Sequence, residues 1–145
     1  MTILFFNTSF FAKQVGEDFN PAVGFIRRRS MRRYYVTMGV HPRPRTKSIQ
    51  EINPFVEIDY ITNLSSVLET RRITGGVTLT LGSSAEFTAQ INDQFERLNE
   101  SFFIPGATLI KPGDYKFRDA TLSYKSSGNS TLKGDVSVTF GDFWD

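Results

Sequence analysis

Acidic side chains are the residues of this sequence whose chemistry stands out first. Glu57 and Asp59 lie two positions apart, and Glu86 has a similar polar setting in a later segment. Glycosidases use paired carboxylates as acid, base or nucleophile, so this pattern raises the hypothesis of glycoside hydrolysis. The alternative, which we adopt, is that these residues line a hydrated surface opposite Arg72 and Lys133.

The single histidine adds little to that chemistry. His41 precedes Pro42 in an expected loop, and the sequence contains no cysteine. A zinc site needs several His, Cys or acidic ligands, and a Ser-His-Asp arrangement would depend on this one imidazole. We therefore predict no catalytic residue, no metal site, no cofactor and no enzymatic activity.

A run of arginines is the strongest local charge feature. Guanidinium groups pair with phosphates, so the run could bind phosphate on lipopolysaccharide or on a nucleic acid. Alternatively, these arginines lie at the mouth of a strand, where the loop acids Glu17 and Asp18 pair with some of them. The candidates for contact with an anionic group are Arg27, Arg28, Arg29, Arg32 and Arg33.

The segment from Arg72 to Glu96 indicates which elements position these residues. Apolar and polar side chains alternate with a period of two on both sides of a small polar cluster at 82–85, which predicts a long antiparallel hairpin. Each arm keeps the alternation for about ten residues, and a tilted strand needs roughly nine to eleven to cross a bilayer. The apolar positions that would face lipid include Val77, Leu79, Leu81, Phe87, Ala89, Ile91, Val136, Val138 and Phe140.

One acidic residue opposes a lipid-facing surface. Asp93 lies on the apolar side, between Ile91 and Phe95. Counted from the turn, it falls about 20 Å along an apolar band that is ~25 Å tall. This position is near the rim of the band, where a charge is tolerated better than at its centre.

Length and composition set further limits. The 145 residues suit a single domain over 1–145, and 17 basic against 15 acidic residues give a net charge of only +2, which does not favour a nucleic-acid partner. The 14 Phe and 5 Tyr suit β structure and membrane interfaces. The sequence contains no run of 18 apolar residues, so no transmembrane helix is predicted, and its first residues lack a signal-peptide pattern. We expect either a protein that is not exported or a sequence that lacks its original beginning.

Other segments extend the strand pattern to about seven strands without a helix. Tyr115 and Phe117 have the opposite parity to Ala120 and Leu122, which predicts a bulge near Asp119. The two long connections, 14–29 and 98–113, would lie at the same end of an up-and-down meander. Because single-chain barrels close with an even number of strands, we expect further strands from the same or a neighbouring chain.

Three segments resemble a bacterial family of unknown function. They are 16–28 (GEDFNPAVGFIRR), 110–117 (IKPGDYKF) and 136–145 (VSVTFGDFWD), in the order that the family shows. Its members carry a family-9-type carbohydrate-binding module followed by a C-terminal β-barrel region. The resemblance covers the barrel region and implies the outer membrane of Gram-negative bacteria and an association with polysaccharide handling, through a module that this chain lacks.

The sequence therefore predicts an all-β chain, an antiparallel meander of about seven long strands that forms part of a transmembrane β-barrel. It would act as a membrane anchor or pore, with membrane lipid as its partner and no nucleic acid. The rival hypothesis is a soluble all-β binding module, a sandwich or lipocalin-like barrel for a carbohydrate or apolar ligand, whose alternation would point apolar groups inward.

Overall fold

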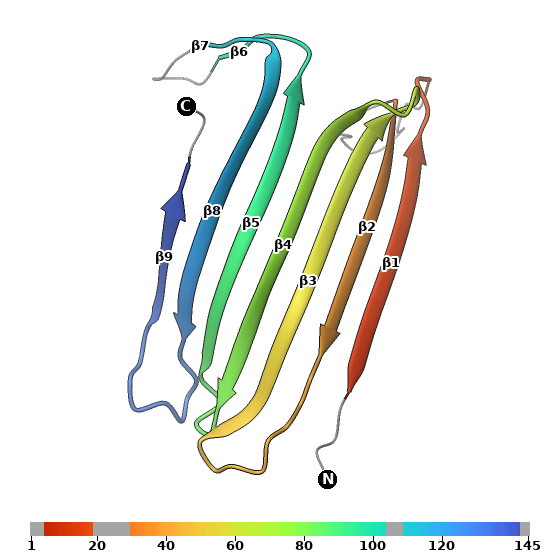
Figure 1. Ribbon diagram of the computed structural model, residues 1–145. Coiled ribbons are helices and arrows are strands. Elements are labelled where there is room, and N and C mark those ends of the chain that lie inside the picture. Colours follow the sequence, from red (N-terminus) through yellow and green to blue (C-terminus); the bar gives the residue numbers. More distant parts are fainter. Residues whose placement is uncertain (1–4, 19–29, 104–108, 143–145) are drawn as a thin grey trace.

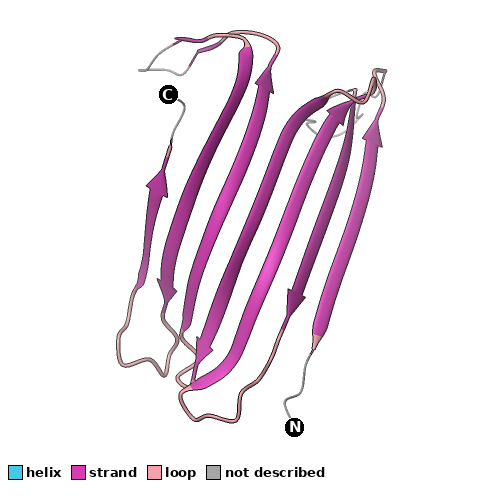
Figure 2. Ribbon diagram, viewed as in Figure 1, coloured by secondary structure: helices cyan, strands magenta, loops and turns pink. Residues whose placement is uncertain are grey.

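The computed structural model describes residues 5–18, 30–103 and 109–142 and shows a single seven-stranded antiparallel sheet with a small hairpin beside it (Figure 1). Its strands are β1 (Phe6–Val15), β2 (Met31–Val40), β3 (Ile49–Asn63), β4 (Leu68–Leu81), β5 (Glu86–Leu98), β8 (Gly113–Lys125) and β9 (Asp135–Gly141). The hairpin of β6 (Phe102–Phe103) and β7 (Leu109–Ile110) lies in the connection from β5 to β8. The predicted all-β antiparallel meander is confirmed (Figure 2).

Strand order in the sheet follows chain order, with β1 and β9 at the two edges. Connections 16–30, 64–67 and 99–112 meet at one end of the sheet, as predicted, and 41–48, 82–85 and 126–134 meet at the other (Figure 1). Within the described ranges, neither edge strand pairs with a second neighbour. No described residue belongs to a helix that could cross a membrane.

The turn between β4 and β5 forms where the sequence predicts it. Leu81 donates its backbone N–H to the carbonyl of Ala85 at 2.8 Å, and Ser84 donates to the carbonyl of Leu81 at 2.8 Å. Ser84 has a φ of 64°, a left-handed conformation that small polar residues tolerate in tight turns. The two arms of the predicted hairpin are therefore joined as expected.

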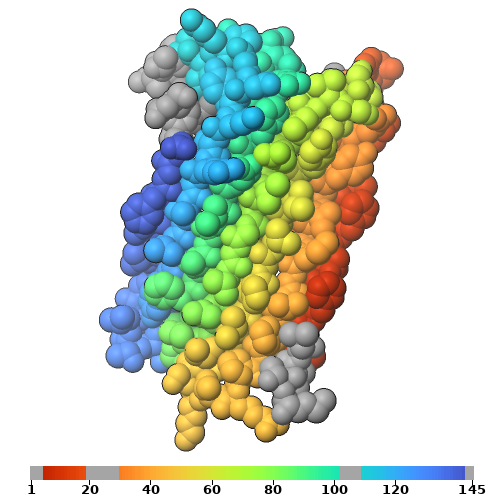
Figure 3. Space-filling view, viewed as in Figure 1, coloured from red at the N-terminus to blue at the C-terminus, as the bar shows by residue number. Residues whose placement is uncertain are grey.

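Strand register sorts the side chains into two faces, because directly opposed residues point the same way. Val77 pairs with Ala89 and Leu79 with Phe87 on one side, while Thr78 pairs with Thr88 on the other. We call the first side the apolar face, and it contains all nine positions that the sequence places together. We call the second the polar face. Space-filling atoms of neighbouring strands form a continuous surface from β1 to β9 (Figure 3).

The predicted bulge near Asp119 is wrong. β5 and β8 keep an unbroken register from the Glu86–Lys125 pair to the Leu98–Gly113 pair. Tyr115 and Phe117 therefore lie on the polar face, as aromatic residues among polar neighbours. The register shifts instead at the two ends of the β3–β4 pair, where Gln50 and Glu69 are the extra residues. The backbone of β8 is regular, and its apolar residues lie on the polar face in the first part of the strand and on the apolar face in the second part.

This sheet has almost no interior. Among the described residues the buried apolar side chains are Val15, Ala85 and Phe95, and no large side chain is fully buried. A soluble domain of this size normally packs one face of such a sheet against a second layer. The described chain supplies no second layer, so both faces of this sheet are open.

Candidate functional site

The apolar face is an extended, exposed hydrophobic surface. Exposed fractions reach 67% for Phe6, 63% for Ile91 and 60% for Phe140. These residues come from β1, β5 and β9, so the exposure spans the whole width of the sheet. A contiguous apolar surface of this extent marks a contact with another protein or with a membrane.

Polar residues at the end of the apolar face define a boundary that crosses the sheet obliquely. The first polar residue beyond the apolar ones is Thr62 in β3, Arg71 in β4 and Asp93 in β5. Arg71 pairs with Tyr60 and Asp93 lies beside Ile73, the partner of Ile58. The boundary thus moves from the level of Thr62 to that of Ile58, which is four residues along β3.

The polar face is hollowed over its central strands. A depression of about 750 Å³ is lined by residues of β3, β4, β5, β8 and β9, including Glu57, Arg72 and Asp119. Two aromatic rings, Phe55 and Phe117, lie at its wall among hydroxyl, amide and charged groups. This hollow is therefore lined largely by hydrophilic groups.

A ladder of cross-strand hydrogen bonds covers the floor of this hollow. Asp119 accepts from Asn92 Nδ2 at 2.5 Å and from Gln94 Nε2 at 3.0 Å. Thr74 Oγ1 donates to Asn92 Oδ1 at 2.7 Å, and Arg72 Nε donates to Gln94 Oε1 at 3.1 Å. The bonds connect β4, β5 and β8 and hold the polar side chains in place.

Of the three candidate carboxylates, Glu86 lies far from the other two. Glu57 lies opposite Thr74, whereas Glu86 lies opposite Thr80 and Lys125. Six residues of β4 separate these two levels, which is about 20 Å along a strand, and glycosidase carboxyl groups lie within about 10 Å of each other. Asp59 is engaged by Arg33 through two hydrogen bonds of 2.8 Å.

The cations expected opposite these acids have different positions. Arg72 pairs directly with Asp59 on the polar face, as the sequence suggests. Lys133 lies in the connection before β9 rather than in the strand. The hydrated wall that we predict for the acids is therefore built mainly by the strands β2 to β5 and β8.

The predicted arginine cluster is split between the two faces. Arg27, Arg28 and Arg29 lie outside the described residues. Arg32 is on the apolar face, where it donates to Gln14 Oε1 at 2.9 Å and to Ser66 Oγ at 3.1 Å. Arg33 points to the polar face and is neutralised by Asp59. Contact of these arginines with an anionic group stays a prediction, and Arg32 is the described member whose hydrogen-bond partners are neutral.

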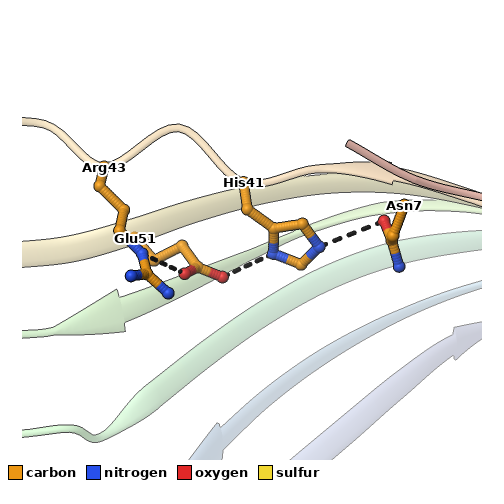
Figure 4. A network of polar contacts seen from close by, with 4 residues as sticks. All are labelled: Asn7, His41, Arg43 and Glu51. Carbon is orange, nitrogen blue, oxygen red and sulfur yellow. Dashed lines mark hydrogen bonds and ion pairs between the residues drawn. The ribbon is translucent and has the colours of Figure 1, made fainter. Parts of the chain in front are cut away.

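His41 takes part in a polar network at the end of the sheet that carries connection 41–48 (Figure 4). Its Nδ1 lies 2.6 Å from Glu51 Oε1 and its Nε2 lies 3.2 Å from Asn7 Oδ1, while Arg43 Nε donates to Glu51 Oε2 at 2.9 Å. Glu51 lies on the polar face, between the apolar-face pairs Ile49–Leu81 and Ile52–Leu79. The described residues contain no group of three or more side chains suited to a metal ion, and the network ties β1, β3 and the loop together.

A second charged cluster lies on the apolar face at its boundary. Asp93 accepts from Arg71 Nη2 at 2.7 Å through one oxygen and from Arg118 Nε at 2.7 Å through the other. The carboxylate that opposed a lipid-facing surface is therefore bound by two cations. Lys116 lies on the same face, directly opposite Phe95.

Comparisons with protein-family models, with curated proteins and with solved structures gave no significant match. The resemblance noted from the three sequence segments stays a prediction. The function is therefore inferred from the two faces of the sheet.

Sequence reasoning missed the cluster around Asp93 and the network around His41. Arg71 and Arg118 are 22 and 25 residues from Asp93 in the chain, and only the strand register brings them together. The regular alternation of β4, β5 and β8 could have indicated this cluster. With the correct strand register, it places Asp93 directly opposite Arg118 and places Arg71 in the next row of the same face.

Proposed function

We propose that this chain forms part of the wall of a bacterial outer-membrane β-barrel and serves as a membrane anchor or pore. The observation that carries the proposal is a single-layered sheet with an exposed apolar face and a hollow polar face. Hydrocarbon would cover the apolar face, and water in a lumen would solvate the polar one. An association with polysaccharide handling rests on the sequence resemblance.

The height of the apolar face supports this function. In β3 the apolar-face residues Ile52 and Tyr60 are eight residues apart, and both lie inside the boundary at Thr62. This separation corresponds to about 26 Å along a strand. With a tilt of about 40°, the span along the membrane normal is about 20 Å, close to the ~25 Å band of outer-membrane barrels. Exposed aromatic residues lie at both ends of this face, Tyr34 and Tyr60 at one end and Phe6 and Phe87 at the other, which matches the girdles found at the two interfaces.

The oblique boundary also supports it. Strands that cross a membrane at about 40° and lie about 4.8 Å apart meet a horizontal edge at levels that differ by about 4 Å, or ~1.2 residues, from one strand to the next. Across the six steps from β1 to β9 this amounts to about seven residues. The observed shift is four residues: the boundary stays at the level of Thr62 from β1 to β3, where Gln14 pairs with Arg32 and Arg32 with Thr62, and it reaches the level of Ile58 in β5. It stays at that level in β8 and at Asp142, which follows β9 and donates its backbone N–H to the carbonyl of Arg118. All seven strands lean the same way (Figure 1).

The rival hypothesis of a soluble module fits the hollow less well. In a lipocalin-like barrel or a sandwich the apolar groups occupy the inner, concave side. Here a hollow of about 750 Å³ lies on the polar face and is lined by Glu57, Arg72 and Asp119. A soluble module would also need a second layer over residues such as Ile91 and Phe140.

Single-cysteine labelling tests the proposal without background, because the chain has no cysteine. Ile91→Cys and Val138→Cys report the apolar face, and their sequence neighbours Gln90→Cys and Thr139→Cys are the matched controls on the polar face. Each full-length variant is reconstituted into vesicles, labelled with an environment-sensitive dye, and exposed to quenchers attached to lipid chains or dissolved in water.

We expect lipid-attached quenchers to reach the labels at 91 and 138, and aqueous iodide to reach those at 90 and 139. Equal access of the lipid quencher to both faces would contradict the proposal. A chain that stays folded and monomeric without detergent or lipid would contradict it too, and would favour the soluble module.

A further inference from the structure

A basic depression lies at the boundary of the apolar face. It has a volume of about 530 Å³ and is formed where β4, β5, β8 and the end of β9 meet. Arg71, Lys116 and Arg118 line it, together with the acids Asp93 and Asp142. Three cations against two carboxylates leave this part of the apolar face positively charged.

The ion pairs at this depression leave donor groups free for another anion. Asp93 binds Arg71 through Nη2 with one oxygen and Arg118 through Nε with the other, so each guanidinium keeps further N–H groups. The side chain of Arg118 is 77% exposed. Asp114, the acidic residue two positions before Lys116 on the same face, is held by Arg97 through hydrogen bonds of 2.6 and 2.7 Å. A phosphate group, which accepts several hydrogen bonds from Arg and Lys, complements this arrangement.

The surroundings of the depression are those of a membrane interface. Tyr34 and Tyr60 lie in the same cross-strand row as Arg71 and Lys116, and their exposed fractions are 41% and 36%. Tyrosine side chains concentrate at the level of lipid headgroups because the ring is apolar and the hydroxyl is polar. Phe95, in the same row, lies at the wall of the depression. Apolar residues on one side and cations on the other match a lipid whose phosphate lies just above its acyl chains.

We propose that the depression around Arg71, Lys116 and Arg118 binds the phosphate of an anionic lipid headgroup. This inference rests on the proposed membrane location and adds to it a defined lipid-binding site. The acyl chains would lie along the apolar rows below Arg118, while the phosphate would accept from Lys116 and the two guanidinium groups. The same end of the sheet carries the two long connections (Figure 1), so the site would occupy only one leaflet.

Lipid selectivity tests the site directly. A fluorescent label at Phe140→Cys lies one row below the depression, opposite Ala120. The full chain is reconstituted into phosphatidylcholine vesicles, and quenching is compared for brominated phosphatidic acid, brominated phosphatidylcholine and a brominated fatty acid. The fatty acid carries negative charge without phosphate and separates recognition of phosphate from simple attraction of anions.

We expect phosphatidic acid to be preferred over both other lipids. Lys116→Gln and Lys116→Gln/Arg118→Gln should lower this preference about fivefold for each cation removed. The matched control is Arg72→Gln, which removes one charge from the polar face next to Arg71 and should leave the preference unchanged. Inorganic phosphate added to the vesicles should not abolish the preference.

Three outcomes would overturn the inference. Equal quenching by all three lipids, or an equal loss of preference in Arg72→Gln, would show that no such site exists, although the membrane location would stand. Loss of the preference in the presence of inorganic phosphate would show a site for free phosphate instead of lipid. If no brominated lipid quenches the label, the chain does not face lipid, and the proposed function fails together with the inference.

Discussion

Gly76 provides a sensitive test of which face of the sheet is crowded. It lies on the polar face opposite Phe55, and a Cβ atom there would lie 2.8 Å from the carbonyl oxygen of Ala89, 2.8 Å from Phe55 Cζ and 2.9 Å from Gln90 Cβ. Its neighbour Gly75 points to the apolar face, where nothing lies within 4 Å of such an atom. Alanine should therefore have opposite effects at these adjacent positions.

The size of the two effects follows from these distances. Gly76→Ala forces a methyl group into contact with a backbone oxygen that cannot move independently, and overpacking of this kind costs about 1–3 kcal/mol. Gly75→Ala meets no obstacle and restricts the unfolded chain, which stabilises by up to ~1 kcal/mol. With an m-value of about 2 kcal/mol/M in urea, the unfolding midpoint should fall by ~0.5–1.5 M for Gly76→Ala. It should stay the same or rise by up to ~0.5 M for Gly75→Ala.

Urea titration of the full chain in vesicles, followed by the fluorescence of its tyrosines and tryptophan, measures both midpoints. Adding Phe55→Leu to Gly76→Ala should restore part of the loss, because the ring clash is relieved while the clash with Ala89 persists. A wild-type midpoint for Gly76→Ala, or an equal loss for Gly75→Ala, would refute the assignment of these glycines to opposite faces.

Two further predictions concern the charged clusters. Asp93→Ala leaves Arg71 and Arg118 without their acid and should destabilise the chain by about 1–2 kcal/mol, mostly through the less exposed Arg71. Asp93→Ala/Arg71→Ala should recover part of this loss in urea titration, and no recovery would argue that Arg71 does not depend on this carboxylate. Glu51→Gln removes the charge that Arg43 and His41 share and should destabilise the chain by about 1 kcal/mol in the same titration. An unchanged unfolding midpoint would argue against a stabilising role of this network.

Local alternation was sufficient to predict most of the strands. Period two in 72–96 identifies both arms and the turn at 82–85, because side chains of a strand point alternately to its two faces whatever strand lies beside it. The meander also predicts that the two long connections lie at the same end of the sheet, because alternate connections of an up-and-down sheet lie at the same end. These features depend only on residues close together in the chain.

Other features depend on pairing between distant segments and could not be predicted in this way. The register shifts at Gln50 and Glu69 are properties of two strands together. The aromatic rings of Tyr115 and Phe117 were expected on the apolar side, because the prediction equated apolar residues with one face. The hollow of the polar face accommodates Phe117 among polar groups instead.

The direction of the edge strands has a consequence for assembly. Seven strands that alternate in direction leave β1 and β9 running the same way. A ring closed by joining these two edges, or by joining two copies head to tail, would contain parallel seams. A wholly antiparallel ring requires an odd number of additional strands between β9 and β1, and one such strand would complete a ring of eight. Until that strand is in place, two rows of backbone amides and carbonyls can recruit any free β-segment, so these seven strands should associate with other chains when they are produced alone.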